Sequence, residues 1–155
     1  MDITLTNLLK RDTLSNVLEE LKQKFHPDTL YEPPITFFPS YKFNEQNEYS
    51  IVGKKIRLPG HADRIIFFSK SALMTESITN YDMKTYTLKS DHKPITCLYN
   101  DAGNKIYLLS WNLASGEKFG IHNFEELSIE LNNNIIDNID KDRSDYIILN
   151  LQDIY

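Results

Sequence analysis

Residues that could handle a phosphate gather between Arg57 and Phe68. The stretch Arg57-Leu58-Pro59-Gly60-His61-Ala62-Asp63-Arg64 holds two guanidiniums, an imidazole and a carboxylate around a Pro-Gly turn, and it leads into the apolar run Ile65–Phe68. We expect this run to be a strand that is buried on both faces. Asp63 and Arg64 must then be paired or face a cleft. Two interpretations stay open: a site for phosphate oxygens, which guanidiniums match, and a buried Asp–Arg pair without chemistry.

Two further runs carry groups of the same kind. Pro39-Ser40-Tyr41-Lys42-Phe43 places a hydroxyl, a phenol and an ammonium at the end of an apolar segment, which suits an oxyanion. The other interpretation is a surface loop with an ordinary lysine, and for this run alone that interpretation is favoured. In Ser90-Asp91-His92-Lys93-Pro94, the imidazole could contact a phosphate oxygen and Asp91 could hold a metal or a water.

The elements that must position these groups follow from periodicity and turn signals. Leu14, Val17, Leu18, Leu21 and Phe25 share one helical face, with Thr13 or Ser15 as the N-cap. Asn123 and Glu126 form a capping box for a second helix that runs to about Asp140. We expect strands at 35–38, 95–99, 105–110 and 146–151, the last one buried, and a turn at 100–104.

Composition narrows the class of protein. A chain of 155 residues is long enough for one domain with a real core. Its net charge of −5 argues against a general nucleic-acid binder. The single Cys97 forms no internal disulfide, which fits a reducing compartment. With no run of 18 apolar residues, we expect a soluble, cytoplasmic protein, with contact at membrane surfaces as a further possibility.

Taken together, the runs 39–43, 57–65 and 90–94 resemble the C-terminal half of the inositol polyphosphate 5-phosphatases, which belong to the endonuclease/exonuclease/phosphatase superfamily. Trp111-Asn112-Leu113 and Leu151-Gln152-Asp153 resemble the start of the same superfamily. Residues 1–99 therefore resemble its end, 100–104 form a connecting turn, and 105–155 resemble its beginning. The middle is absent, including the Gly-Asp-x-Asn motif whose carboxylate aligns the attacking water in that family.

The resemblance implies a fold class and leaves two arrangements open. The fold class is α/β, an α+β sandwich that is a reduced or permuted form of the four-layered superfamily fold. The chain is either a single domain over 1–155, permuted and without its middle, or a piece that spans the junction of two tandem domains. In the superfamily fold the first and last strands are neighbours, so a hairpin at 100–104 could join them.

The resemblance also implies residue roles. The catalytic residues would be His92, which contacts the scissile phosphate, Asp63, which orients His92, and Asp91, which completes the acidic cluster. The substrate-binding residues would be Tyr41, Lys42, Arg57 and Arg64. The Mg²⁺ ligands would be Asn112 and Asp153, although Asp153 is one methylene shorter than the glutamate of the family.

The implied activity is Mg²⁺-dependent hydrolysis of a phosphomonoester of an inositol phosphate or phosphoinositide headgroup, attenuated because the water-aligning motif is absent. An alternative is an inactive phosphoinositide-binding module, or a fragment that needs a complementary chain. A nuclease ranks last, because the acidic charge suits DNA poorly. An open sheet edge where the middle would pair predicts a homo-oligomer or a complementing chain.

Overall fold

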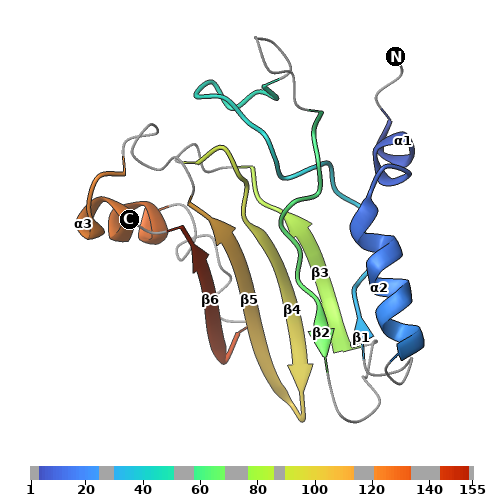
Figure 1. Ribbon diagram of the computed structural model, residues 1–155. Coiled ribbons are helices and arrows are strands. Elements are labelled where there is room, and N and C mark those ends of the chain that lie inside the picture. Colours follow the sequence, from blue (N-terminus) through green and yellow to red (C-terminus); the bar gives the residue numbers. More distant parts are fainter. Residues whose placement is uncertain are drawn as a thin grey trace.

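The computed structural model describes residues 4–24, 30–50, 58–68, 77–85, 90–113, 121–133 and 144–153. Figure 1 shows two sheets, one of four strands in the order β3-β4-β5-β6 and one that pairs β1 with β2. The elements in chain order are α1 (Leu5–Leu9), α2 (Thr13–Lys24), β1 (Leu30–Tyr31), β2 (Phe67–Phe68), β3 (Ile78–Met83), β4 (Ile95–Asp101), β5 (Asn104–Asn112), α3 (Phe124–Leu131) and β6 (Tyr146–Gln152).

A hairpin joins β4 to β5 at the predicted turn. The antiparallel ladder runs from Ile95 opposite Ser110 to Asp101 opposite Asn104. Ala102 and Gly103 form the tip with φ values of 48° and 94°, the left-handed region that two-residue hairpin turns require and that glycine adopts without strain. The hairpin therefore places the strand that follows the 90–94 run directly beside the strand that ends in Trp111-Asn112.

β6 runs parallel to β5 and forms the other end of the sheet. A parallel pair needs a long crossover, and this one contains α3. The Asn123 side chain accepts a hydrogen bond from the Glu126 N–H at 3.0 Å. The Glu126 carboxylate accepts one from the His122 N–H at 2.5 Å. The Asn123 cap is confirmed, but the Glu126 carboxylate reaches the N–H of His122, one residue before the cap, instead of that of Asn123. The predicted continuation of the helix to Asp140 lies outside the described residues.

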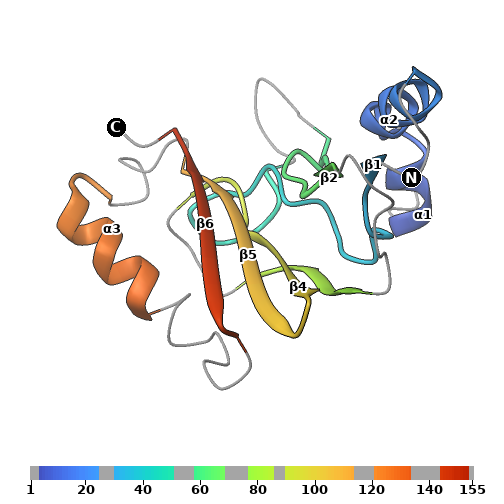
Figure 2. The same cartoon turned by 90° about the horizontal axis from the view of Figure 1, so that it is seen from below.

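Apolar side chains fill both faces of the four-stranded sheet. On one face, Leu127 of α3 packs with Leu109, Trp111 and Leu113, and Figure 2 shows α3 on the side of β5 and β6 that lies away from α1 and α2. On the other face, Phe37 packs with Tyr81, Ile95 and Cys97. Cys97 and Trp111 are fully buried, as expected of core residues. The layered arrangement confirms the predicted α/β class as a reduced sandwich.

Two predicted strands take a different form. The segment 35–38 pairs with no strand, although Phe37 is buried, because Pro33, Pro34 and Pro39 remove backbone donors on both sides of it. The run from Ile65 shortens to β2, which pairs only with β1. Its side chains alternate instead of being buried on both faces, so Ile66 and Phe68 are 38% and 61% exposed.

Two more expectations need correction. The predicted strand at 146–151 exists as β6, but it is exposed, because β5 is its one partner in the described part of the sheet. Asp12, rather than Thr13 or Ser15, caps α2: its carboxylate accepts hydrogen bonds from the Leu14 N–H at 3.2 Å and from the Ser15 hydroxyl at 2.5 Å. An aspartate at this position satisfies a backbone donor that the first helical turn leaves unpaired.

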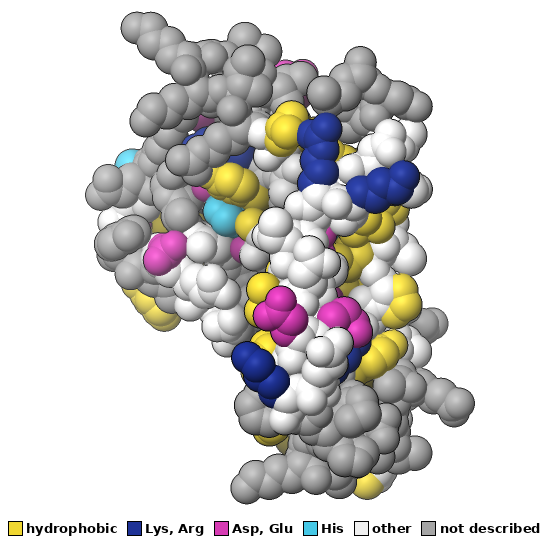
Figure 3. Space-filling model, turned by 45° about the vertical axis from the view of Figure 1, so that its right-hand side comes forward, with side chains coloured by type: hydrophobic (Ala, Val, Ile, Leu, Met, Phe, Trp, Pro, Cys, Tyr) yellow, Lys and Arg dark blue, Asp and Glu magenta, His cyan; other side chains and the backbone are white. Residues whose placement is uncertain are grey.

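The surface gives two further observations. Figure 3 shows acidic and basic side chains interspersed over one face, so the described residues there produce no field of a single sign. Among the described residues, no helix has the length and apolar character that crossing a membrane requires.

Candidate functional site

His92 is held by a carboxylate that is itself held by a hydroxyl. The Asp63 oxygens accept from His92 Nδ1 at 2.8 and 3.0 Å. The Ser40 hydroxyl donates to the same carboxylate at 2.6 Å and accepts from the Asp63 N–H at 3.2 Å. Ser40 is fully buried and the Asp63 side chain is 3% exposed, while the His92 side chain keeps 12% exposure. Only the far side of the imidazole can therefore meet a ligand.

Backbone hydrogen bonds hold the three polar runs singled out in the sequence side by side. Tyr41 exchanges two bonds with Gly60, of 3.2 and 2.8 Å. The Lys93 N–H donates to the Ser40 carbonyl at 2.8 Å, and the Phe43 N–H donates to the Asp91 carbonyl at 2.9 Å. These bonds act as short bridges rather than as long strands. They bring residues from 39–43, 58–63 and 90–94 to one place, although 14 residues separate the first run from the second and 26 separate the second from the third.

The Tyr41 ring borders the imidazole, and Lys42 pairs with Asp91 beside it in the chain. The Tyr41 ring lies 4.3 Å from the His92 ring, centroid to centroid, at an angle of 33°. Lys42 Nζ lies 3.0 Å from Asp91 Oδ2, and the lysine side chain is 35% exposed while that of Asp91 is 6% exposed. The other Asp91 oxygen, Oδ1, is buried and accepts no hydrogen bond from the residues that the structure describes. A buried carboxylate oxygen without a donor is costly unless a cation or a donor from a ligand meets it.

The tail of the chain reaches the same region. Trp111 Nε1 donates to the His92 carbonyl at 3.2 Å, and the Ser90 hydroxyl donates to the Asn112 carbonyl at 2.8 Å. Asn112 Nδ2 donates in turn to Asp153 Oδ2 at 2.9 Å. Asn112 and Asp153, at the ends of the paired strands β5 and β6, are therefore in contact with each other and lie next to the turn that carries Asp91.

Arg64 differs from the role that the resemblance implies. Its guanidinium forms ion pairs with Asp12, at 2.7 Å, and with Glu32, and the side chain is 4% exposed. Burial lowers the pKa of Arg64, but the hydrogen bonds and charges of Glu32 and Asp12 raise it by more. This guanidinium is thus engaged by two carboxylates and ties α2 and β1 to the strand segment, and we assign it no substrate contact.

Arg57 lies outside the described residues. The pair between Asp63 and Arg64 that the sequence left open does not form. Asp63 pairs with His92, whereas Arg64 pairs with Asp12 and Glu32.

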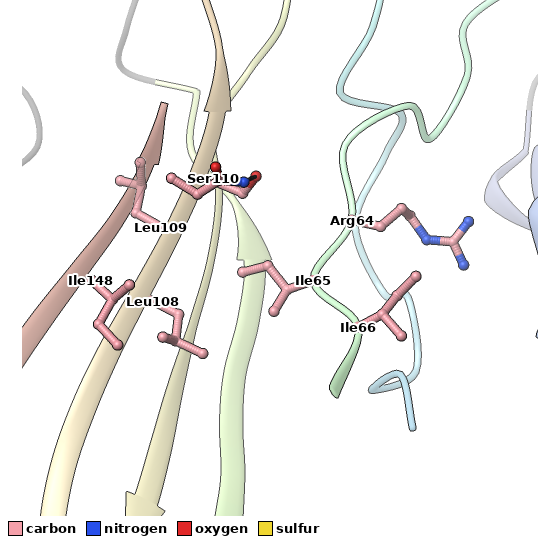
Figure 4. A pocket seen from close by; sticks show the side chains of 8 residues that line it. Arg64, Ile65, Ile66, Leu108, Leu109, Ser110 and Ile148 are labelled. Carbon is pink, nitrogen blue, oxygen red and sulfur yellow. Dashed lines mark hydrogen bonds between the residues drawn. The ribbon is translucent and has the colours of Figure 1, made fainter. Parts of the chain in front are cut away.

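A cavity of about 210 Å³ lies between β5, β6 and the segment at 64–66. Figure 4 shows Ile65 directed toward the sheet and the Arg64 guanidinium directed away from it. Apart from Arg64, no residue expected in the site lines this cavity, whose walls include Leu108, Leu109 and Ile148. Ser110 and Asn150 add polar groups to its lining, and the polar groups around His92 form a separate feature.

Sequence reasoning considered Ser40 as an oxyanion contact and not as the partner of Asp63, and it gave Glu32 and Asp12 no role. Ser40 stands directly before the Tyr-Lys pair, and a small hydroxyl residue there is a usable signal once Asp63 is suspected. Nothing in the sequence links Glu32 or Asp12 to Arg64, since 32 and 52 residues separate them. Those contacts depend on how α2 and β1 pack.

Comparison with known proteins finds a matching family model and similar proteins. A family model described as Endonuclease/Exonuclease/phosphatase family 2 matches residues 3–98. The chain is 29% identical over 109 residues to a probable inositol polyphosphate 5-phosphatase of Schizosaccharomyces pombe, an alignment that covers 64% of this chain and 9% of that protein. It is 35% identical over 83 residues to type I inositol polyphosphate 5-phosphatase 13 of Arabidopsis thaliana, covering 44% and 7%. The chain thus spans less than a tenth of the length of either relative. No solved structure matches it.

The matched region contains Ser40, Asp63 and His92, whereas Asn112 and Asp153 lie beyond it. The family match and the hydrogen-bonded cluster therefore coincide over the first hundred residues. Because the match extends over more than half of the sequence, the chain belongs to Endonuclease/Exonuclease/phosphatase family 2.

Proposed function

We propose that the chain handles the phosphate groups of inositol phosphates in the manner of an inositol polyphosphate 5-phosphatase, with weak Mg²⁺-dependent hydrolysis of a phosphomonoester. The observation that carries the proposal is the hydrogen-bonded series Ser40–Asp63–His92, with the Tyr41 ring against His92 and Lys42 Nζ 5.6 Å from the centre of that Tyr41 ring. The two 5-phosphatase relatives give the substrate class its support.

Each residue has a role that follows from its contacts. Asp63 fixes the His92 ring by accepting from Nδ1, which leaves Nε2 to contact a phosphate oxygen. Ser40 keeps the carboxylate from rotating. Lys42, partly exposed and next to a buried carboxylate, can turn its charge toward an anionic ligand. The stacked Tyr41 ring shields one face of the imidazole from water.

The residues at the ends of β5 and β6 fit a magnesium ion by their chemistry. Asn112, Asp153 and Asp91 offer only oxygen donors, and Asp91 Oδ1 is buried without a partner. The described residues include no cluster of three or more acidic, histidine or cysteine side chains suited to a metal. Mg²⁺ commonly takes one or two carboxylates and keeps several waters, so a smaller set is sufficient. When bound there, the ion would polarise the phosphoryl group and offset its developing charge.

The proposed activity is attenuated for a reason that lies in the sequence. The 155 residues contain no Gly-Asp-x-Asn run, so no carboxylate of that motif aligns the attacking water. Loss of a general base costs typically about 10²–10⁴-fold in rate. We therefore expect the purified chain to turn over far below the 1 to 10³ s⁻¹, roughly, that is usual for enzymes.

Phosphate release and calorimetry test the proposal. The purified chain is mixed with a soluble inositol polyphosphate, with and without Mg²⁺. We expect slow release that depends on Mg²⁺ and on His92, so that His92→Ala removes it and His122→Ala, at an exposed histidine, leaves it unchanged. Release that is equal in both variants would contradict the proposal.

A second candidate is a phosphoinositide-binding module, or a fragment that needs a complementary chain, and it is favoured by the missing motif. Calorimetry separates the two, because this candidate gives binding without phosphate release. Lys42→Ala should weaken binding, whereas Lys84→Ala, which removes a similar surface Lys–Asp pair of 3.3 Å, should not. Cytoplasmic location and contact with a membrane surface belong to the same proposal, and binding to vesicles that contain phosphoinositide tests the latter.

A further inference from the structure

β6 ends the four-stranded sheet with an edge that is open in the described part of the chain. β5 pairs with one side of it through all seven residues, and no described strand pairs with the other side. Figures 1 and 2 both show it as the outermost strand of the sheet. Tyr146, Ile147, Ile148 and Leu149 are 58%, 40%, 52% and 37% exposed. The strand therefore offers free backbone groups between two rows of exposed apolar side chains.

β3 forms the opposite edge of the sheet, and it has features that keep an edge from pairing with another chain. β6 lacks these features. β3 shifts register between Thr79 and Asp82, and Asn80 has a φ of 53°. The Asp82 side chain is 53% exposed. Bulges and charges are the usual devices that keep an edge strand from pairing with another chain. The seven residues of β6, Tyr-Ile-Ile-Leu-Asn-Leu-Gln, contain no charge, proline or glycine.

We propose that β6 pairs antiparallel with β6 of a second copy of this chain, so that two four-stranded sheets join into one about a two-fold axis. An uncharged strand that is apolar on both faces complements itself, and a two-fold arrangement occupies both open edges with one contact. The proposal concerns a surface apart from His92 and does not depend on the proposed function.

The register follows from sheet geometry and charge. Residues opposite each other in an antiparallel pair share a face of the sheet. A pairing centred on Ile148 puts Tyr146 opposite Asn150 and Ile147 opposite Leu149 of the second copy. A pairing centred on Leu149 would instead set Asp145 against Asp153, and like charges directly opposite each other are unfavourable. We therefore place the axis at Ile148.

The area available sets the strength of the dimer. At about 200 Å² for a large side chain, the four exposed residues present roughly 350–400 Å² per copy, and pairing also covers the edge backbone. Stable interfaces bury about 1,200 Å² or more in total. Two copies together therefore cover roughly 700–800 Å² of side-chain area, which is below that figure, so the expected dimer is weak and should exchange and depend on concentration.

Sedimentation or light scattering over a range of concentrations tests the proposal. We expect a shift from monomer to dimer with the full chain, and at least about a tenfold higher dissociation constant for Ile148→Lys, because two ammoniums would meet at the axis. Ile129→Lys is the matched control, since Ile129 is also 52% exposed but lies on α3. Circular dichroism and melting of both variants verify that they fold.

Cysteine cross-linking tests the register and identifies other occupants. Ile148→Cys should form an intermolecular disulfide on oxidation. Tyr146→Cys should not, because its two copies would lie about 13 Å apart along the strands, beyond disulfide reach. The native Cys97 is fully buried and does not compete. A chain that stays monomeric at all concentrations, as when a different polypeptide occupies the edge, overturns the proposal, and so does a dimer that Ile148→Lys leaves intact.

Discussion

Asp63 is the residue on which the candidate site depends, because its carboxylate joins the Ser40 hydroxyl to His92 Nδ1. We predict that Asp63→Asn lowers phosphate turnover about 10–100-fold, the effect usual for a group that orients another. Nitrogen NMR of the imidazole should show loss of the fixed Nδ1–H form, a signal that mere instability would not give. Asp101→Asn, at an exposed position in the hairpin, should change neither quantity.

Arg64 supports stability rather than ligand binding, since its guanidinium is buried between the carboxylates of Asp12 and Glu32. Arg64→Met should lower the free energy of unfolding by about 3–5 kcal/mol, because it leaves two buried carboxylates without the cation that offsets their charge. Urea denaturation measures the change.

Lys22→Met is the control for that measurement. It removes an exposed pair with Glu19 of 2.8 Å, and the expected cost is below about 0.5 kcal/mol. If Arg64→Met left stability unchanged and instead weakened binding of an inositol phosphate, the guanidinium would be a ligand for the substrate after all.

Among the elements, α3 depends on its cap, because the crossover must hold it over β5 and β6. Removing the Asn123 side chain leaves the Glu126 N–H without its acceptor. Asn123→Ala should lower the free energy of unfolding by about 1 kcal/mol, and Asn123→Asp should restore it, because an aspartate caps equally well. Thermal or urea unfolding provides the comparison, and equal losses in both variants would show that the cap is not the cause.

The elements also show how far sequence reasoning reaches. The hairpin at 100–104, the Asn123 cap and the strands that became β4 and β5 were predictable, because turn residues and periodicity act locally. The exposure of β6 was not predictable, since an apolar run has the same sequence at a sheet edge as in a sheet centre. The segment 35–38 does not pair because Pro33, Pro34 and Pro39 flank it, and these prolines were evidence against a strand that the sequence already contained.

The candidate site likewise combines contacts that the sequence predicts with contacts that it does not predict. The contact between Asp63 and His92 was expected from the family resemblance, and the two side chains do meet. The capture of Arg64 by Asp12 and Glu32 could not be foreseen, because it requires knowing that α2 and β1 pack beside the strand segment. Contacts within the family runs are encoded by their motifs, whereas contacts between a run and the helices around it emerge only from packing.

For the molecule as a whole, Lys93 makes stability depend on pH. Its side chain is fully buried, with Nζ 4.9 Å from the centre of the Phe43 ring. Burial lowers the pKa of Lys93 to about 8, although the charge of Glu130 opposes the shift. The unfolded chain, with a lysine pKa of about 10.4, binds more protons between these values. The free energy of unfolding should therefore rise with pH across this window and be lowest below pH 8.

Denaturation at pH 7.5 and pH 10 measures this dependence. Relative to Lys93→Met, the wild-type chain should gain about 3 kcal/mol over the full window, an order-of-magnitude figure from the difference between the two pKa values. The variant cancels the titration of tyrosines, which both chains share. Lys105→Met, at an exposed lysine, should follow the wild type, and a flat difference for Lys93→Met would mean that its amine is not desolvated.

The β4–β5 hairpin has a consequence for how the chain can be divided. Its tip at Ala102 and Gly103 is exposed, while the single ladder that pairs β4 with β5 spans seven residue pairs. A backbone cut at such a tip removes connectivity but little packing. Separately expressed halves, 1–102 and 103–155, should therefore reassemble when mixed, and the Trp111 indole of one half would again donate to the His92 carbonyl of the other, making the chain a natural candidate for a split reporter.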